Sequence, residues 1–199
     1  MRRGGIRAAL SRAGRGAGFP LAAGAGETAG VIAFEIRPAR SGDGSGVAEA
    51  WQDSAEFYRQ IAPDWFRSPR SDGLARWLEG KLVGGGADRL SLVADQDGEA
   101  VGFVHAALSP PNEDADRQVT RDVGMRRVFV NALAVQRSHW RSGVGTALME
   151  AVERWGRERG AELLTLETFA ASPVSVPFYE DRMGYERHAI VFAKRLREA

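Results

Sequence analysis

The stretch that decides the fold is Leu133–Trp155, with the sequence LAVQRSHWRSGVGTALMEAVERW. It begins as an apolar run and passes through a short polar loop into Gly143-Val144-Gly145. Apolar residues three or four positions apart then predict a helix with one buried face. The first N–H groups of such a helix lack partners within it, and the helix dipole adds partial positive charge. Glycine lets the backbone approach a ligand closely, so this turn suits a phosphate or pyrophosphate group.

The spacing of these glycines excludes two common nucleotide-binding motifs. The dinucleotide fingerprint has a third glycine where this chain has Leu148, and the Gly-Lys-Ser/Thr of the P-loop is absent. A Gly-x-Gly turn before a helix is a weak signal by itself. The assignment therefore depends on the elements around the turn.

The rest of the chain predicts strands and helices in an order typical of a single sheet. Asp97-Gly98 joins two alternating apolar segments, which is a strong signal for a β-hairpin. The expected strands are residues 31–37, 89–95, 99–108, 125–135, 161–168 and 185–196, and the expected helices are 47–61, 72–83, 143–159 and 174–183. This order predicts one mixed sheet of the α/β (α+β) class with helices on its faces.

The N-terminal segment differs from the remainder in composition. Its first 26 residues hold five Arg, seven Gly and no acidic residue. Glycine-rich chain with little apolar area favours a disordered tail over residues 1–30, or a mis-assigned start, ahead of one folded domain over residues 31–199. A transit segment and a nucleic-acid-binding arm are the alternatives that stay open.

Charge and cysteine content exclude several classes of function. The net charge is +1, but without the first 26 residues the chain has 22 basic and 26 acidic side chains, so we expect no nucleic-acid partner. The absence of Cys excludes a disulfide scaffold, a Cys-ligated zinc site and a thiol nucleophile. The chain contains no apolar run of 18 residues or more, so we predict no membrane span. No spacing of His, Asp or Glu indicates a metal site. The preference for Arg over Lys is typical of a GC-rich bacterial genome, so we expect a cytoplasmic protein.

Two motifs resemble the GNAT superfamily of acyl-CoA-dependent N-acetyltransferases. The family pattern Q/R-x-x-G-x-G/A is matched by Trp140-Arg141-Ser142-Gly143-Val144-Gly145, with Trp140 in place of Gln or Arg. Downstream, Ser172-x-x-Ser175-x-x-Phe178-Tyr179 followed by Gly184-Tyr185 is similar to the family's N-x-x-A-x-x-F-Y and G-F. Ile36-Arg37-Pro38-Ala39 resembles the family's first strand, so the resemblance covers about residues 32–199.

The resemblance implies a mostly antiparallel sheet with a splayed pair of central strands, and acetyl-CoA as co-substrate. Pantetheine would pair with the backbone of the strand that ends in LAV, as a peptide adds to a sheet edge. The resemblance implies these cofactor-binding residues: Leu133, Ala134, Val135, Arg141, Ser142, Gly143, Val144, Gly145, Thr146 and Ser172.

The same resemblance assigns catalytic roles. Tyr179 would protonate the leaving thiolate, because a phenol on the helix beside the sulfur can donate a proton. Glu167 would act as the general base that deprotonates the acceptor. Asn131 holding a water molecule and His105 remain alternatives for the base.

The expected function is transfer of an acetyl group from acetyl-CoA to a primary amine of a small molecule or peptide. With no Cys in the chain, the transfer would be direct, since no protein thiol can carry the acyl group. The alternative is a catalytically silent acyl-CoA-binding regulatory module on the same fold. A homodimer is an expectation by analogy only.

Overall fold

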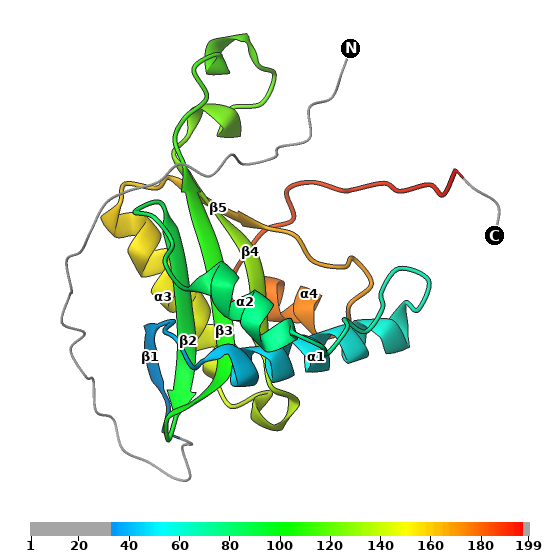
Figure 1. Ribbon diagram of the computed structural model, residues 1–199. Helices are drawn as coiled ribbons and strands as arrows, with labels where there is room; N and C mark the ends of the chain where they lie inside the picture. Colours follow the sequence, from blue (N-terminus) through cyan, green and yellow to red (C-terminus); the bar gives the residue numbers. More distant parts are fainter. Residues whose placement is uncertain (1–32, 197–199) are drawn as a thin grey trace. The chain divides into compact units, whose positions relative to one another are not determined.

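The computed structural model describes residues 33–196, which fall into two compact units, residues 33–166 and residues 167–196. The predictions for residues 1–30 lie outside the described residues. The first unit holds a five-stranded sheet in the order β1-β2-β3-β4-β5 (Figure 1). Its strands are β1 (Glu35–Pro38), β2 (Arg89–Gln96), β3 (Glu99–Ser109), β4 (Arg127–Val135) and β5 (Leu163–Leu166). Only the β4–β5 pair is parallel, which confirms the mixed, mostly antiparallel α/β sheet.

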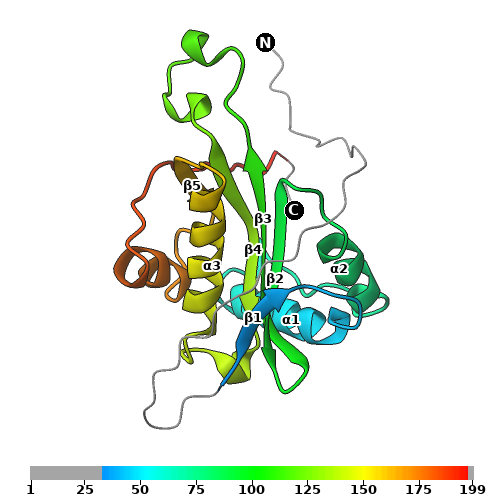
Figure 2. The ribbon, with the colours of Figure 1, turned by 90° about the vertical axis from the view of Figure 1, so that its left-hand side faces the viewer.

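Helices cover both faces of this sheet. Helices α1 (Gly44–Ile61) and α2 (Leu74–Leu82) lie on one face, and α3 (Val144–Glu158) lies on the other (Figure 2). The predicted hairpin between β2 and β3 is confirmed, since Asp97 and Gly98 both have positive φ, +53° and +88°. Two successive residues with positive φ match the right-handed twist of the strands they join.

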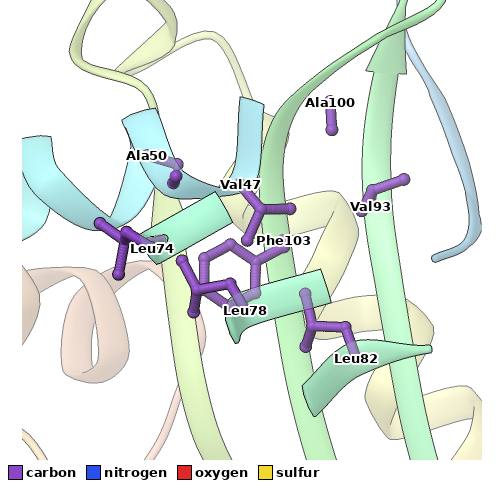
Figure 3. Packing of buried hydrophobic residues seen from close by; sticks show 10 residues of the cluster. Val47, Ala50, Leu74, Leu78, Leu82, Val93, Ala100 and Phe103 are labelled. Carbon is purple, nitrogen blue, oxygen red and sulfur yellow. The ribbon is translucent and has the colours of Figure 1, made fainter. Parts of the chain in front are cut away.

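The core under α1 and α2 forms where apolar residues of both helices meet the sheet. Phe103 on β3 lies at the centre of this cluster and is 1% exposed (Figure 3). Val47 on α1 and Leu78 on α2 belong to the same cluster. On α3 the predicted apolar face is buried as well, including Val144, Leu148, Ala151 and Val152.

Gly46 allows α1 to pack directly on the sheet. A Cβ atom at this position would lie 2.1 Å from the carbonyl oxygen of Ala100, closer than any real contact. Because only glycine lacks that atom, the N-terminal turn of α1 can rest on the backbone of β3.

A partly buried ion cluster ties β1 to the start of α1 and to β2. Arg37 donates to the Asp43 carboxylate at 2.7 and 2.8 Å and to Oδ2 of Asp95 at 2.6 Å. Burial raises the pKa of Asp43, but hydrogen bonds from Arg37 and from the Arg40 N–H together outweigh it, and the pKa lies below its ordinary 3.8. The pKa of Asp95 is lowered in the same way, burial being outweighed by hydrogen bonds from Arg37 and the Gly98 N–H.

The second unit corrects the expectation of a final strand over residues 185–196. It contains a short helix, α4 (Ser175–Pro177), that continues into a π turn, Phe178–Arg182. No strand follows among the described residues, and Ile190, Val191 and Phe192 are 76–90% exposed. A strand needs a partner for its backbone hydrogen bonds, and the described part of this unit holds no other strand.

Replacing Gly46 tests the close approach of α1 to β3. We expect Gly46→Ala to lower the free energy of unfolding by about 3 kcal/mol, because the methyl group forces the helix away from Ala100. The matched control is Gly80→Ala in α2, where a Cβ meets nothing within 4 Å, and we expect a gain of about 0.5–1 kcal/mol. Urea unfolding of both variants measures the difference, and equal stabilities would contradict the packing described here.

The ion cluster predicts a stability loss in acid. The folded pKa values of Asp43 and Asp95 lie below the unfolded value of 3.8, so their contribution is complete above that pH. It disappears as the pH falls through the lower folded values, because the unfolded chain then binds more protons. We expect the free energy of unfolding of the wild type to fall more steeply below about pH 4 than that of Asp43→Asn or Asp95→Asn. Denaturant unfolding from about pH 5 downward checks this, and parallel curves would refute it.

Candidate active site

A bulge in β4 separates this strand from β5. The β3–β4 register runs from His105↔Ala132 directly to Ala106↔Val130, so Asn131 is an extra residue without an opposite partner. The parallel β4–β5 register ends at Val130↔Leu166, although β4 continues to Val135. A bulge bends its strand and increases the local twist. Beyond Val130, β4 therefore has an edge that β5 does not cover, which agrees with the expected splay of the central strands.

The peptide groups at this edge can be assigned from one hydrogen bond. The N–H of Gln136 donates to the carbonyl oxygen of Val101 at 2.9 Å and so points towards β3. In the same planar peptide group the C=O of Val135 points the opposite way, to the uncovered side. By alternation, the N–H and C=O of Leu133 also point to that side. The N–H and C=O of Ala134 point to β3 instead, and its side chain packs into the core.

The turn before α3 forms a cradle of backbone N–H groups, contributed by Gly143, Val144, Gly145 and Thr146. None of them has an acceptor among the described residues, and the first helical bond is from the Ala147 N–H to the Gly143 carbonyl, at 3.0 Å. Gly143 has φ +92°, a conformation that favours glycine, and Arg141 has φ +64°. Such left-handed residues turn successive N–H groups to one side, where they can bind an anion.

The two residues that offer alternatives to Glu167 as the base, His105 and Asn131 through a bound water, lie near the bulge. Nδ1 of His105 is 2.9 Å from the hydroxyl of Ser91 on β2, and the ring is partly buried. Burial, followed by the positive charge of Arg89, lowers the pKa of His105 below 6.5, so the ring is neutral at neutral pH. Asn131 is exposed, and its amide makes one long contact of 3.4 Å to the Phe129 carbonyl. A neutral His105 ring has a nitrogen that can accept a proton, and the Asn131 amide can hydrogen-bond a water molecule.

The other predicted site residues belong to the second unit. The hydroxyl of Ser172 is buried and accepts a hydrogen bond from the Ser175 N–H at 3.0 Å, so it caps the first turn of α4. Tyr179 lies in the π turn, with its ring 5.0 Å from that of Phe178 and 6.0 Å from that of Tyr185. Such turns are frequent at functional sites. Glu167, the residue after β5, is exposed.

One contact of the loop before α3 was not anticipated from the sequence. Nε1 of Trp140 donates a hydrogen bond to the Val135 carbonyl at 2.8 Å. The sequence marks Trp140 only as a departure from the expected Gln or Arg. The sequence offers no local signal for this contact, because the indole N–H of a loop tryptophan finds a protein acceptor only where the fold buries it.

Residues 33–185 match the acetyltransferase (GNAT) family. The chain belongs to this family. Among curated proteins it is 28% identical over 154 residues to the uncharacterized N-acetyltransferase YhfO of Bacillus subtilis, covering 77% of this chain and 90% of that protein. It is also 28% identical over 109 residues to aminoglycoside N(6')-acetyltransferase type 1 of Klebsiella aerogenes, covering 55% of this chain and 66% of that protein.

The fold agrees with solved structures. A mutant of the BH1408 protein from Bacillus halodurans superposes with a TM-score of 0.68 at 18% identity, covering 81% of this chain and 99% of that one. In residues 33–196 no helix is long and apolar enough to cross a membrane. Nor does the described part of the chain hold three or more His, Asp or Glu grouped as metal ligands.

Proposed function

We propose that this GNAT protein transfers the acetyl group of acetyl-CoA directly to a primary amine of a small molecule or peptide, in the cytoplasm. The observation that carries the proposal is the junction of two binding features on one short segment. The uncovered edge of β4 ends at Val135, and the N–H cradle begins at Gly143. An acyl-CoA molecule has both matching parts, a pantetheine arm with two amides and a pyrophosphate.

The backbone supplies most of the proposed cofactor binding. The N–H and C=O of Leu133 and the N–H of Val135 would pair with the amides of pantetheine, as an added strand does. The N–H groups from Gly143 to Thr146 and the α3 dipole would hold the pyrophosphate. Arg141, exposed next to this cradle, adds positive charge.

The proposed chemistry needs one base and one acid. Glu167 takes a proton from the acceptor ammonium, with Asn131 through water or His105 as the alternatives. The free amine then attacks the thioester carbonyl, the C–N bond forms, and the C–S bond breaks. Tyr179 donates its proton to the leaving sulfur, which leaves as the thiol of CoA. The attacking nitrogen loses its second proton to solvent as the amide forms, and the Tyr179 phenolate regains a proton from solvent. Because the chain has no Cys, the acetyl group passes to the amine without a protein thioester.

The proposed acceptor is a small cationic amine. The similarity to an aminoglycoside acetyltransferase supports a small-molecule acceptor rather than a macromolecule. Aromatic residues of α1 and the loop after it offer surfaces for an amine with an apolar body. Among them, Tyr58 and Phe66 stack at 4.8 Å between ring centroids, and Trp65 is 55% exposed.

Substitutions at Gly143 test the anion cradle. We expect Gly143→Asp to weaken CoA binding more than 100-fold, because the carboxylate repels the pyrophosphate at close range. Gly143→Asn is the matched control, since Asn has the same size, tolerates positive φ and carries no charge, and we expect a loss below about tenfold. Isothermal titration calorimetry with CoA measures both. Wild-type affinity in Gly143→Asp would remove the cradle from the proposed site.

Replacing Tyr179 tests the proposed acid. We expect Tyr179→Phe to lower kcat about 100-fold or more with CoA affinity unchanged, because the leaving thiolate loses its proton donor. Tyr185→Phe, which introduces the residue of the family pattern, is the control and should keep wild-type kcat. The assay follows thiol release from acetyl-CoA with a panel of an aminoglycoside, a polyamine and a short peptide with a free amino terminus. CoA binding without amine-dependent thiol release from any of the three would favour the silent binding module.

A further inference from the structure

Trp140 hydrogen-bonds to one of the peptide groups at the uncovered edge of β4. Its indole Nε1 donates to the Val135 carbonyl, which points to the side that β5 does not cover. The hydrogen bond closes a loop from the end of β4, through the 3₁₀ turn Arg137–His139, to the beginning of the N–H cradle. The edge and the cradle are therefore connected by the indole as well as by the chain.

Three residues of helix α1, spaced four apart, contact the same loop. Oε2 of Glu49 accepts from the Gln136 side chain at 3.4 Å, and Oδ2 of Asp53 accepts from the Arg137 N–H at 2.7 Å. One turn further along, the ring of Phe57 meets Trp140 edge to face, with centroids 5.3 Å apart. Residues four apart share one face of a helix, so a single stripe of α1 fixes the loop.

The guanidinium of Arg137 adds a further contact to the indole. It lies 5.8 Å from the centroid of the Trp140 ring, within the range of a cation–π interaction. The indole is thus held by a hydrogen bond at its edge, by Phe57, and by a cation. A side chain restrained in this way has little freedom to lose when a ligand binds.

We propose that Trp140 is a positioning residue that fixes the distance and direction between the β4 edge and the N–H cradle. The inference rests on the proposed acyl-CoA binding and deepens it. With Val135 C=O occupied by the indole, the groups left for pantetheine are the N–H and C=O of Leu133 and the N–H of Val135. The hydrogen bonds of pantetheine to β4 would therefore end at the Val135 N–H, and the pyrophosphate would bind at the N–H cradle from Gly143 onwards.

A positioning role differs from a merely structural one in its ligand dependence. CoA spans both binding features, so it gains from their fixed relation. The nucleotide part of CoA, 3′-phospho-ADP, has the pyrophosphate but lacks the pantetheine arm. It would therefore contact the N–H cradle but not the β4 edge. Loss of the alignment therefore weakens CoA and leaves the fragment unchanged, whereas a damaged fold weakens both.

The experiment compares Trp140→Phe with wild type. Phenylalanine keeps a ring against Phe57 and removes the N–H donor. We expect CoA affinity by calorimetry to fall about five- to tenfold, as for one lost hydrogen bond, with 3′-phospho-ADP affinity within about twofold of wild type. Phe57→Leu, which keeps the indole donor and removes its ring partner, should give a smaller loss for CoA alone. The control is Trp77→Phe, an exposed tryptophan on α2 beside Lys81, with both affinities unchanged.

The outcomes separate the two proposals. Wild-type CoA affinity in Trp140→Phe, or an equal loss for CoA and the fragment, overturns the positioning role and leaves acyl-CoA binding in place. A wild-type protein that binds neither CoA nor the fragment overturns both. Thermal unfolding of each variant accompanies the titrations, and a selective CoA loss at unchanged unfolding temperature supports the assignment.

Discussion

The constraint on which the site depends is the need of every backbone N–H and C=O to find a partner. β4 pairs with β5 only as far as Val130, and the strand then continues to Val135. Within residues 33–166, no strand pairs with the outward peptide groups of β4 beyond Val130. One of these groups, the Val135 carbonyl, accepts a hydrogen bond from Trp140 instead. An extended ligand with amide groups can form the missing hydrogen bonds at such an edge. The backbone of β4 therefore favours a ligand that carries both N–H donors and C=O acceptors.

The divergence of β4 and β5 is maintained by packing on both faces of the sheet. The bulge at Asn131 changes the direction of the end of β4, and α3 follows directly on the turn at Gly143 and buries Val144 and Leu148. On the opposite face, Gly46 brings α1 against β3, close enough for Glu49 and its neighbours along the helix to reach the loop after β4. The position of α1 against the loop after β4 therefore depends on Gly46, which lies outside the proposed binding residues.

The features that sequence reasoning predicted are those encoded by neighbouring residues. Asp97-Gly98 specifies its own turn through positive φ, and Gly143 specifies the cradle for the same reason. The buried face of α3 follows from a period that any amphipathic helix shows. The prediction of a final strand over residues 185–196 was wrong. Alternating apolar residues indicate which side chains a strand would bury, but they do not show whether a partner strand exists.

The features that it missed depend on contacts between distant residues. Nothing local distinguishes Asn131 as the extra residue of a bulge, because the extra residue is defined by the register against β3. Likewise Trp140 is a mismatch in the motif, yet the structure gives it an acceptor in the strand that the motif follows. A motif bound through backbone N–H groups tolerates such a replacement, because every residue except proline supplies the same donor. Gly143 is more constrained, because most side chains would strain a backbone with φ +92°. The variable first position is therefore free to take on an anchoring role, and here an indole does so.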